Sequence, residues 1–266
     1  MVQAVAPRIA DRLVNLKKMK VWNQPAILEK HNNITVVRDD LLSDGGSKIR
    51  FLPYLIEGAE EIVFGGPFCG GAPIALAVVG ALTGQRITLF YAGRKNLHWR
   101  QKRAIELGAQ LHYVSPFGYI SHVQSDARKY AQKIGALFLP LGFDVPAAQE
   151  PFVAAMRDVR KRVGDPDEVW CCCASGMLTR CLAIAFSSSA IKAVTVGLAS
   201  RHKLQNFPSN VTLIDSGYKE LAKESRADCP FSCCRNYERK AWEHAARSAR
   251  GTALFWNVAG DQPLHR

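Results

Sequence analysis

Short apolar, β-branched runs alternate with helical patterns along almost the whole chain. The predicted strands are 34–38, 61–64, 87–91, 110–114, 136–139, 168–173, 193–196, 211–214 and 253–256. The predicted helices are at about 48–58, 71–83, 97–108, 118–134, 148–163, 177–187, 217–224 and 238–249. Such strands pair in parallel, because each helix returns the chain across the sheet. The alternation therefore predicts an α/β fold with parallel sheets covered by helices.

A break in this alternation divides the chain. Residues 140–146 read Pro-Leu-Gly-Phe-Asp-Val-Pro, and the two prolines and the glycine interrupt both patterns. We expect a smaller α/β lobe over residues 46–144 and a larger one made of residues 1–45 and 145–266. A chain of 266 residues, 48% of them hydrophobic, can bury the core that two lobes need.

No segment predicts a membrane span. The longest apolar stretch, 72–82, is about half as long as a bilayer requires. The N-terminal region carries Pro7, Arg8 and Asp11 where a secretory signal needs an uninterrupted apolar core. We therefore expect a cytoplasmic protein.

The chain has eight cysteines. Residues 171–173 are three consecutive cysteines on a predicted buried strand, where neighbouring side chains point to opposite faces. Free thiols in a reducing compartment fit this arrangement better than disulfides. Cys229, Cys233 and Cys234 have a spacing closer to that of metal ligands, but they lack nearby histidines, so we expect no metal.

The chain is strongly basic, with a formal net charge of +12 and a pI near 9.5. Such an excess attracts a polyanion when it gathers on one face, whereas separate basic clusters are ordinary solvated helix faces. Both interpretations stay open, because the charge is spread over several segments. The basic clusters are 94–95, 100–103, 128–129, 157–162 and 235–240.

Lys48 stands where a β-type run, 35–37, has given way to the Gly45-Gly46 turn and a helical pattern begins. We expect Lys48 on the first turn of that helix. The positive end of a helix dipole disfavours the ammonium form, so the neutral amine that attacks carbonyls is easier to reach. A solvated surface lysine is the alternative.

Two turns rich in small residues also precede predicted helices. In residues 169–180 a strand runs through a small-residue turn into a helix, a geometry that aims backbone N–H groups at an anion. The candidate phosphate-binding residues there are Ser175, Gly176, Met177, Leu178 and Thr179. The second turn, 65–73, opens the helix near Pro73 and includes Cys69, Gly70, Gly71 and Ala72. It forms either a substrate-binding loop or a tight turn that only packs a helix on the sheet.

The segment 39–50, Asp-Asp-Leu-Leu-Ser-Asp-Gly-Gly-Ser-Lys-Ile-Arg, resembles the lysine segment of the fold-type II pyridoxal-phosphate (PLP) enzymes. The similarity is to the branch of aminocyclopropane-carboxylate deaminase and D-cysteine desulfhydrase, with Ser47 in place of the usual Asn. The resemblance implies a two-lobed, tryptophan synthase β-like fold. It also implies that Lys48 binds pyridoxal 5'-phosphate covalently as a Schiff base.

The two turns resemble the same family. Ser175 and Gly176 match its phosphate loop, while Ala174, Met177 and Leu178 replace Gly, Gly and Thr; Thr179 is expected to restore a hydroxyl. In the glycine-rich loop the family's Ser, Asn and His become Cys69, Gly70 and Gly71. The resemblance thus implies that residues 69–72 bind substrate, with Cys69 as a catalytic acid or a space-filling residue. The glycines leave room for a bulkier substrate.

The C-terminal third continues the resemblance. Residues 213–218 and 236–241 are similar to two family segments in which tyrosines face the substrate and a glutamate meets the pyridine nitrogen. Tyr218, Tyr237 and Glu238 take those roles by resemblance. Residues 253–260 resemble the family's closing strand and turn.

The implied reaction breaks a bond at the α-carbon of an amino-acid group, as a lyase, deaminase or decarboxylase. The substrate is either an amino-acid group on a modified base of DNA, as in bacteriophage hypermodification pathways, or a free small amino acid. A phage-encoded enzyme would work in the host cytoplasm. A third alternative is a noncatalytic nucleic-acid-binding protein of this fold. A homodimer stays an open expectation. Our candidate DNA contacts are Arg94, Lys95, Arg100, Arg103, Arg235 and Arg239.

Overall fold

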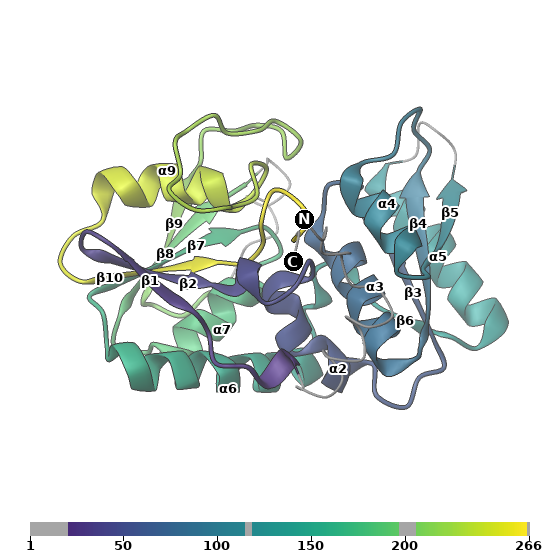
Figure 1. The fold of residues 1–266 in the computed structure, drawn as a ribbon, viewed down its shortest axis with the longest axis horizontal. Coiled ribbons are helices and arrows are strands. Elements are labelled where there is room, and N and C mark those ends of the chain that lie inside the picture. Colours follow the sequence, from purple (N-terminus) through teal and green to yellow (C-terminus); the bar gives the residue numbers. More distant parts are fainter. Residues whose placement is uncertain (1–20, 115–118, 197–205, 265–266) are drawn as a thin grey trace, which may run out of the picture.

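The computed structural model of the chain describes residues 21–114, 119–196 and 206–264. Two α/β lobes lie side by side, and each is built on its own sheet (Figure 1). Helices cover both faces of both sheets, so the predicted fold class is confirmed.

The larger lobe contains a six-stranded sheet in the order β1-β2-β10-β7-β8-β9. The strands are β1 Leu28–His31, β2 Ile34–Arg38, β10 Ala253–Asn257, β7 Glu168–Cys173, β8 Ala190–Thr195 and β9 Val211–Asp215. Only β1 is antiparallel to its neighbour. The sequence prediction missed β1, because residues 28–31 lack an apolar alternation. Asn32, whose φ is +53°, makes the turn that folds β1 onto β2, and asparagine tolerates that conformation better than most residues.

The smaller lobe contains a four-stranded parallel sheet in the order β5-β4-β3-β6. The strands are β5 Gln110–Val114, β4 Arg86–Ala92, β3 Glu61–Gly65 and β6 Leu137–Phe138. These strands precede the predicted lobe boundary at 140–146, where the 3₁₀ helix η4, Leu141–Phe143, leads back to the larger lobe. The boundary residues themselves stay a prediction.

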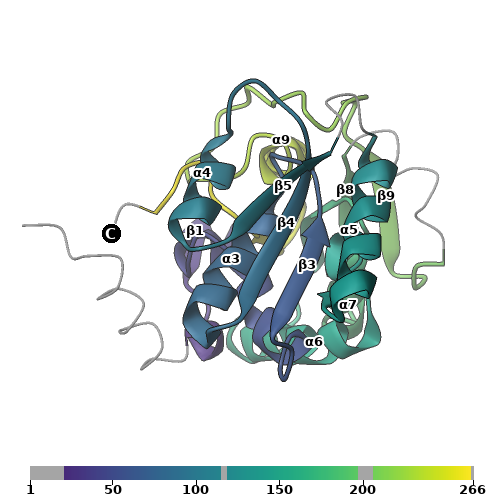
Figure 2. The same cartoon turned by 90° about the vertical axis from the view of Figure 1, so that its right-hand side faces the viewer.

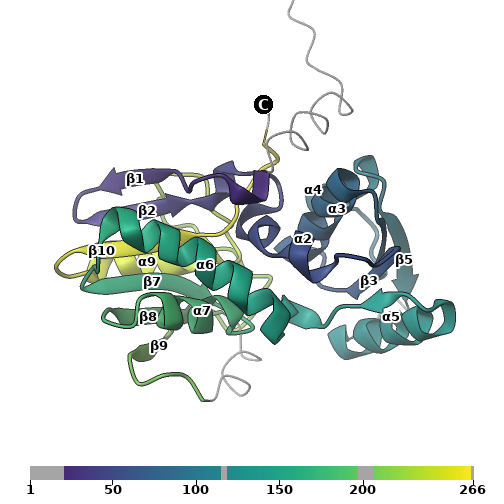
Figure 3. The same cartoon turned by 90° about the horizontal axis from the view of Figure 1, so that it is seen from below.

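Helices sandwich each sheet. In the larger lobe α6 Pro146–Val163 and α7 Met177–Ala185 cover one face, and α9 Glu238–Ser248 covers the other (Figure 3). In the smaller lobe α3 Gly71–Thr83 and α4 Trp99–Glu106 lie on one side, and α5 Ile120–Ile134 on the other (Figure 2). Helix α3 explains the apolar stretch 72–82, because most of its side chains are buried. In the described residues no helix is both long and apolar enough to cross a bilayer.

The consecutive cysteines of β7 alternate between the two faces, as expected for a strand. Cys171 and Cys173 lie in the core cluster that includes α6 and α7, and Cys172 lies in the cluster under α9. All eight cysteines of the chain are free thiols in the structure, which agrees with the sequence prediction.

The predicted helix 48–58 is broken into two short pieces. Residues Gly46–Arg50 form the 3₁₀ helix η3, and Leu52–Leu55 form the four-residue helix α2. Pro53 has no N–H to bond the carbonyl of residue 49, so one continuous helix cannot form there. The expectation that Lys48 occupies the first turn of a long helix is therefore wrong.

The predicted helix 217–224 is also wrong. The segment between β9 and α9 is irregular, although side chains fasten it to its surroundings. The amide of Asn236 donates to the carbonyl of Ala222 at 2.9 Å, and Ser225 Oγ is 3.2 Å from Glu243 Oε2. Bonds from side chains thus replace the internal bonds of a helix.

The largest apolar cluster runs through both lobes without interruption. It includes Leu76 of α3, Ile49 of η3, Met156 of α6 and Trp256 of β10, all fully buried. A shared core of this kind holds the lobes in one arrangement and supports the segments between them.

Candidate active site

A buried carboxylate anchors the segment that carries Lys48. Asp39 belongs to the 3₁₀ helix η2, Asp39–Leu41. It forms an ion pair with Arg50 at 2.6 Å and accepts a hydrogen bond from Ser47 Oγ at 2.7 Å. The indole of Trp256 also donates to Asp39, at 3.2 Å. Because Ser47 and Arg50 flank Lys48, Asp39 fixes the backbone on both sides of the lysine.

Gly46 lets this segment pass close to Val258, the residue that directly follows strand β10. Its φ is +56°, and a Cβ built there would lie 1.9 Å from the carbonyl oxygen of Val258. The next residue, Ser47, donates its N–H to that same carbonyl at 3.0 Å. Both the conformation and the space thus require glycine immediately before the Ser-Lys pair.

The Lys48 amine lies against the first residue of α3. A Cβ built on Gly71 would be 3.5 Å from Lys48 Nζ. Burial lowers the pKa of Lys48; the Glu238 carboxylate opposes this effect, and the Arg100 guanidinium adds to it. The lowered pKa that the sequence predicted is therefore present, but it arises from burial rather than from a helix dipole.

Glu238 faces Lys48 from the larger lobe. It is the first residue of α9 and is 5% exposed, and its Oε2 atom has no hydrogen-bond partner within the described part of the chain. Burial raises the pKa of Glu238 to about 7, and Lys48 lowers it in part. A buried carboxyl oxygen without a partner is costly, so this position fits a ligand group that hydrogen-bonds to Oε2.

Tyr237 and Cys69 join the same group from opposite lobes. Burial raises the pKa of Tyr237, and the thiols of Cys69, Cys234 and Cys172 raise it further. Burial also raises the pKa of Cys69, which keeps its thiol protonated and able to donate. The structure thus brings together four of the predicted catalytic and cofactor-binding residues: Lys48, Cys69, Tyr237 and Glu238.

Tyr218 contacts Glu243 and Lys240 of α9. Its hydroxyl donates to Glu243 of α9 at 3.1 Å, and Lys240 Nζ is 4.8 Å from the centre of its ring. Lys240 in turn donates to the carbonyls of Glu220 and Leu221. The predicted substrate contact of Tyr218 stays a prediction, because its hydroxyl is already bound.

Arg100 belongs to the site and not to the surface. It is 3% exposed, and it donates to the carbonyl of Cys69 at 3.1 Å and to that of Gly260 at 2.9 Å. Its prediction as a DNA contact is therefore wrong, since a buried guanidinium cannot reach a phosphate backbone. Arg100 instead joins the glycine-rich loop of the smaller lobe to the C-terminal end of the larger lobe.

The structure separates the other predicted DNA contacts into two sets. Arg103 is bound by Asp44 at 2.8 Å and by Glu106 at 3.0 Å, and half-buried Arg239 interacts with the Cys233 thiol. Three residues remain exposed: Arg94 and Lys95 after β4, and Arg235, which also pairs with Asp261 at 2.8 Å. Only the exposed set can contact a polyanion directly.

The predicted phosphate loop has the expected backbone but not all the expected side chains. Gly176, with φ of +94°, precedes α7, whose first N–H groups have no partner within the helix. Ser175 is exposed, whereas Met177 is buried in the core and Leu178 is half-buried. Thr179 Oγ1 lies 3.5 Å from Cys171 Sγ in the interior, so the expectation that it restores a hydroxyl for phosphate is wrong. Backbone N–H groups and Ser175 remain as anion ligands.

Two site residues escaped the sequence analysis. Lys240 is fully buried, and burial lowers its pKa. The thiols of Cys172, Cys234 and Cys69 oppose this shift, which places Lys240 beside the site. Its signal was present in the similarity of residues 236–241, which read Asn-Tyr-Glu-Arg-Lys-Ala, to the family segment. Arg100 gave no such signal, because a sequence does not distinguish a buried arginine from the exposed ones around it.

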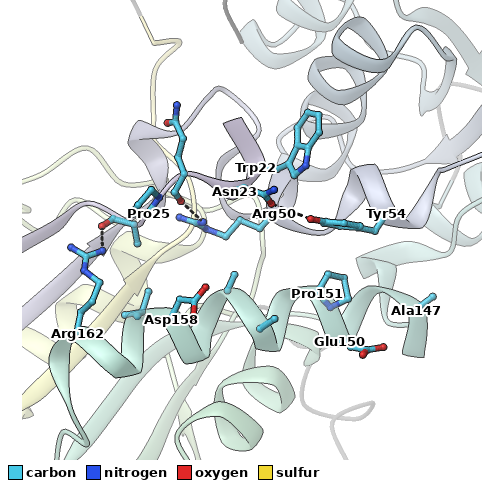
Figure 4. A pocket seen from close by; sticks show the side chains of 15 residues that line it. Trp22, Asn23, Pro25, Arg50, Tyr54, Ala147, Glu150, Pro151, Asp158 and Arg162 are labelled. Carbon is cyan, nitrogen blue, oxygen red and sulfur yellow. Dashed lines mark hydrogen bonds between the residues drawn. The ribbon is translucent and has the colours of Figure 1, made fainter. Parts of the chain in front are cut away.

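The structure also has a hollow whose lining includes neither Lys48 nor Glu238 (Figure 4). Its volume is about 730 Å³, and it lies between η1 Val21–Asn23, α2 and α6. Arg50 lines it and donates to the carbonyl of Gln24 at 2.9 Å, while its other nitrogens bind Asp39. In the described part of the chain no three His, Cys, Asp or Glu side chains are grouped to hold a metal ion.

Comparisons with known proteins bear on the fold. No protein-family model matches the sequence, and no curated protein matches it. Among solved structures, a homologue of ACC deaminase has a TM-score of 0.72 at 14% identity and covers 91% of each chain. Threonine deaminase isoform 2 from Solanum lycopersicum has a TM-score of 0.68 at 13% identity, covering 99% of this chain and 91% of that one. The O-acetylserine-dependent cystathionine β-synthase from Helicobacter pylori has a TM-score of 0.67 at 16% identity, covering 92% and 95%.

The chain has the fold of the fold-type II PLP enzymes. This confirms the architecture that the resemblance implied. At 13–16% identity the likeness shows the fold alone, so the chemistry of this chain has to be argued from its own residues.

Proposed function

We propose that this chain is a PLP-dependent enzyme that breaks a bond at the α-carbon of an amino-acid group. The observation that carries the proposal is the pairing of half-buried Lys48 with buried Glu238. The lysine has a lowered pKa, and the carboxyl has an oxygen without a partner in the described residues. PLP chemistry needs a nucleophilic amine and a carboxyl group that pairs with the ring nitrogen, and Lys48 and Glu238 can supply these two groups.

The residues fit the cofactor at three points. Lys48 would hold it covalently, Glu238 Oε2 would accept a hydrogen bond from its ring nitrogen, and the first turn of α7 with Ser175 would bind its phosphate. When bound, PLP supplies an electron sink that stabilises negative charge on the α-carbon. Lys48 Nζ is the group available to remove or return the α-proton, and Cys69, which is protonated and lies on the glycine-rich loop, is available to donate one.

An absorbance titration tests the cofactor. PLP added to the purified protein should produce an absorbance band near the edge of the visible range, and Lys48→Ala should abolish it. Lys240→Met serves as a control, because Lys240 is also a lysine beside the site but is fully buried and bonded to backbone carbonyls. If the band is lost in Lys240→Met and kept in Lys48→Ala, the lysine that binds PLP is not Lys48.

For the substrate we propose an amino-acid group carried on DNA, with a free small amino acid as the alternative. The glycine-rich loop supports the first, because Gly70 and Gly71 leave space where the family carries larger side chains. Arg94 supports it as well, since it is exposed and stacks on Phe68 of that loop, 3.7 Å from the ring centre. Tyr237, Cys69 and Glu238 suit either substrate.

Retention on DNA distinguishes the two substrates. The pair Arg94→Gln/Lys95→Gln should reduce the slope of log affinity against log salt by about 1.8, or about 0.9 for each contact on duplex DNA. The matched pair Lys129→Gln/Lys133→Gln removes the same charge from α5, which lies on the side of the small sheet opposite α3 and α4, and should leave the slope unchanged. Equal effects of both pairs, or no retention at low salt together with turnover of a free amino acid, would support the small-molecule alternative.

A further inference from the structure

Two cysteine thiols touch beside the candidate active site. Cys229 and Cys233 belong to the irregular segment before α9, and their sulfur atoms lie 2.9 Å apart. This distance is only about 0.9 Å longer than a disulfide bond. The described residues around the pair contain no metal-binding group that would account for the contact.

The two thiols differ in exposure and in pKa. Cys229 is half-exposed, whereas Cys233 is fully buried. The pKa of Cys229 is lowered, first by its hydrogen bond with Cys233 and further by Arg239 and Arg38. A partly exposed thiol with a lowered pKa, in contact with a buried second thiol, is the arrangement that favours oxidation through a sulfenic acid.

We propose that Cys229 and Cys233 form a redox modification site, which a hydroperoxide converts into an intramolecular disulfide. The Cys229 thiolate attacks one peroxide oxygen, which breaks the O–O bond, leaves Cys229 as a sulfenic acid and releases the other oxygen as water once protonated. Cys233 sulfur then attacks the Cys229 sulfur and gives up its proton, and the hydroxyl leaves as a second water. Two thiols are oxidised and hydrogen peroxide is reduced to two waters; a dithiol reverses the change by exchange.

The disulfide would stiffen the segment that presents Tyr237 and Glu238. The N–H of Cys234 donates to the carbonyl of Ala259, and the N–H of Arg239 donates to the carbonyl of Cys234, both at 3.0 Å. Cys234, which directly follows residues 229–233, is thus joined by a backbone hydrogen bond to the first turn of α9. A covalent ring over these residues restricts the fluctuations of that start.

Peptide mapping tests the proposal on the whole protein. Trypsin releases residues 227–235, Ala-Asp-Cys-Pro-Phe-Ser-Cys-Cys-Arg, which contain both thiols and Cys234. After treatment with hydrogen peroxide, denaturation at acidic pH and alkylation, the peptide should be about 2 Da lighter in its cysteines and carry one alkyl group, on Cys234. Dithiothreitol before alkylation should restore three alkyl groups.

Cys229→Ser and Cys233→Ser should each remove the linked form completely. Backbone amides of residues 229–239 should also exchange several-fold more slowly in the oxidised wild-type protein, but not in peroxide-treated Cys229→Ser. Three alkylated cysteines after peroxide, a bond that includes Cys234, or a sulfinic acid on Cys229 as the main product would overturn the proposal. None of these results depends on the cofactor, so they are separate from any failure of the proposed function.

Discussion

Glu238 affects both the chemistry of the site and the pH dependence of the protein's stability. Its folded-state pKa of about 7 exceeds the ordinary value of 4.5, so the folded protein binds this proton more tightly than the unfolded chain. Stability from this group is complete below pH 4.5 and is lost as pH rises through 7.

We expect the protein without cofactor to lose about 3 kcal/mol of unfolding free energy across that window because of Glu238. Urea unfolding at pH 5 and pH 8 measures the loss, and Glu238→Gln should reduce it. Glu238→Gln should also keep PLP bound while it lowers turnover by about tenfold or more, because the amide no longer holds the ring nitrogen protonated. Identical pH dependence in both proteins would show that Glu238 ionises normally.

Gly46 is the residue where the backbone is most tightly constrained. Gly46→Ala should destabilise the protein by more than about 2 kcal/mol, because the added Cβ meets the Val258 carbonyl at 1.9 Å and φ is positive. Gly58→Ala is the matched control: its φ is +78°, and the added Cβ meets nothing within 4 Å. Equal losses in the two variants, measured by urea unfolding, would mean that the contact with Val258 is not restrictive.

At the scale of elements, the start of α7 should bind phosphate through its backbone. Thr179→Val removes only a hydroxyl that faces Cys171, so PLP affinity should change less than about twofold. Gly176→Ala, at a φ of +94°, should distort the turn and weaken PLP by about tenfold or more. Equilibrium titration with PLP measures both. A large loss of PLP affinity in Thr179→Val alone would show that the Thr179 hydroxyl is a phosphate ligand.

The sequence predicted those elements whose pattern is local. The parallel strands and the helices α3, α4, α5, α6, α7 and α9 follow from apolar periodicity, whereas Lys48 and Glu238 were selected by motif similarity and their roles stay predictions. It failed where tertiary contacts decide the conformation. Pro53 divides the predicted helix 48–58, Asn236 and Ser225 hold residues 217–224 in an irregular path, and the burial of Arg100 depends on the approach of Gly260 from far along the chain.

At the scale of the whole molecule, the core that crosses both lobes predicts one cooperative transition. Fluorescence reports all five tryptophans, among them Trp256 in the larger lobe and Trp99 in the smaller, and far-UV circular dichroism reports both sheets. The urea midpoints from the two probes should coincide, because exposing Leu76 or Ile49 in one lobe removes packing from the other. Two resolved transitions would show that the lobes unfold independently.

The proposed chemistry depends on the identity of the lysine that binds PLP. Borohydride reduction of the PLP-loaded protein, followed by tryptic mapping, tests it directly. An adduct on Lys48 blocks cleavage there and should yield the modified peptide 39–50, ending at Arg50. An adduct on another lysine, or unmodified Lys48 after complete reduction, would contradict the account.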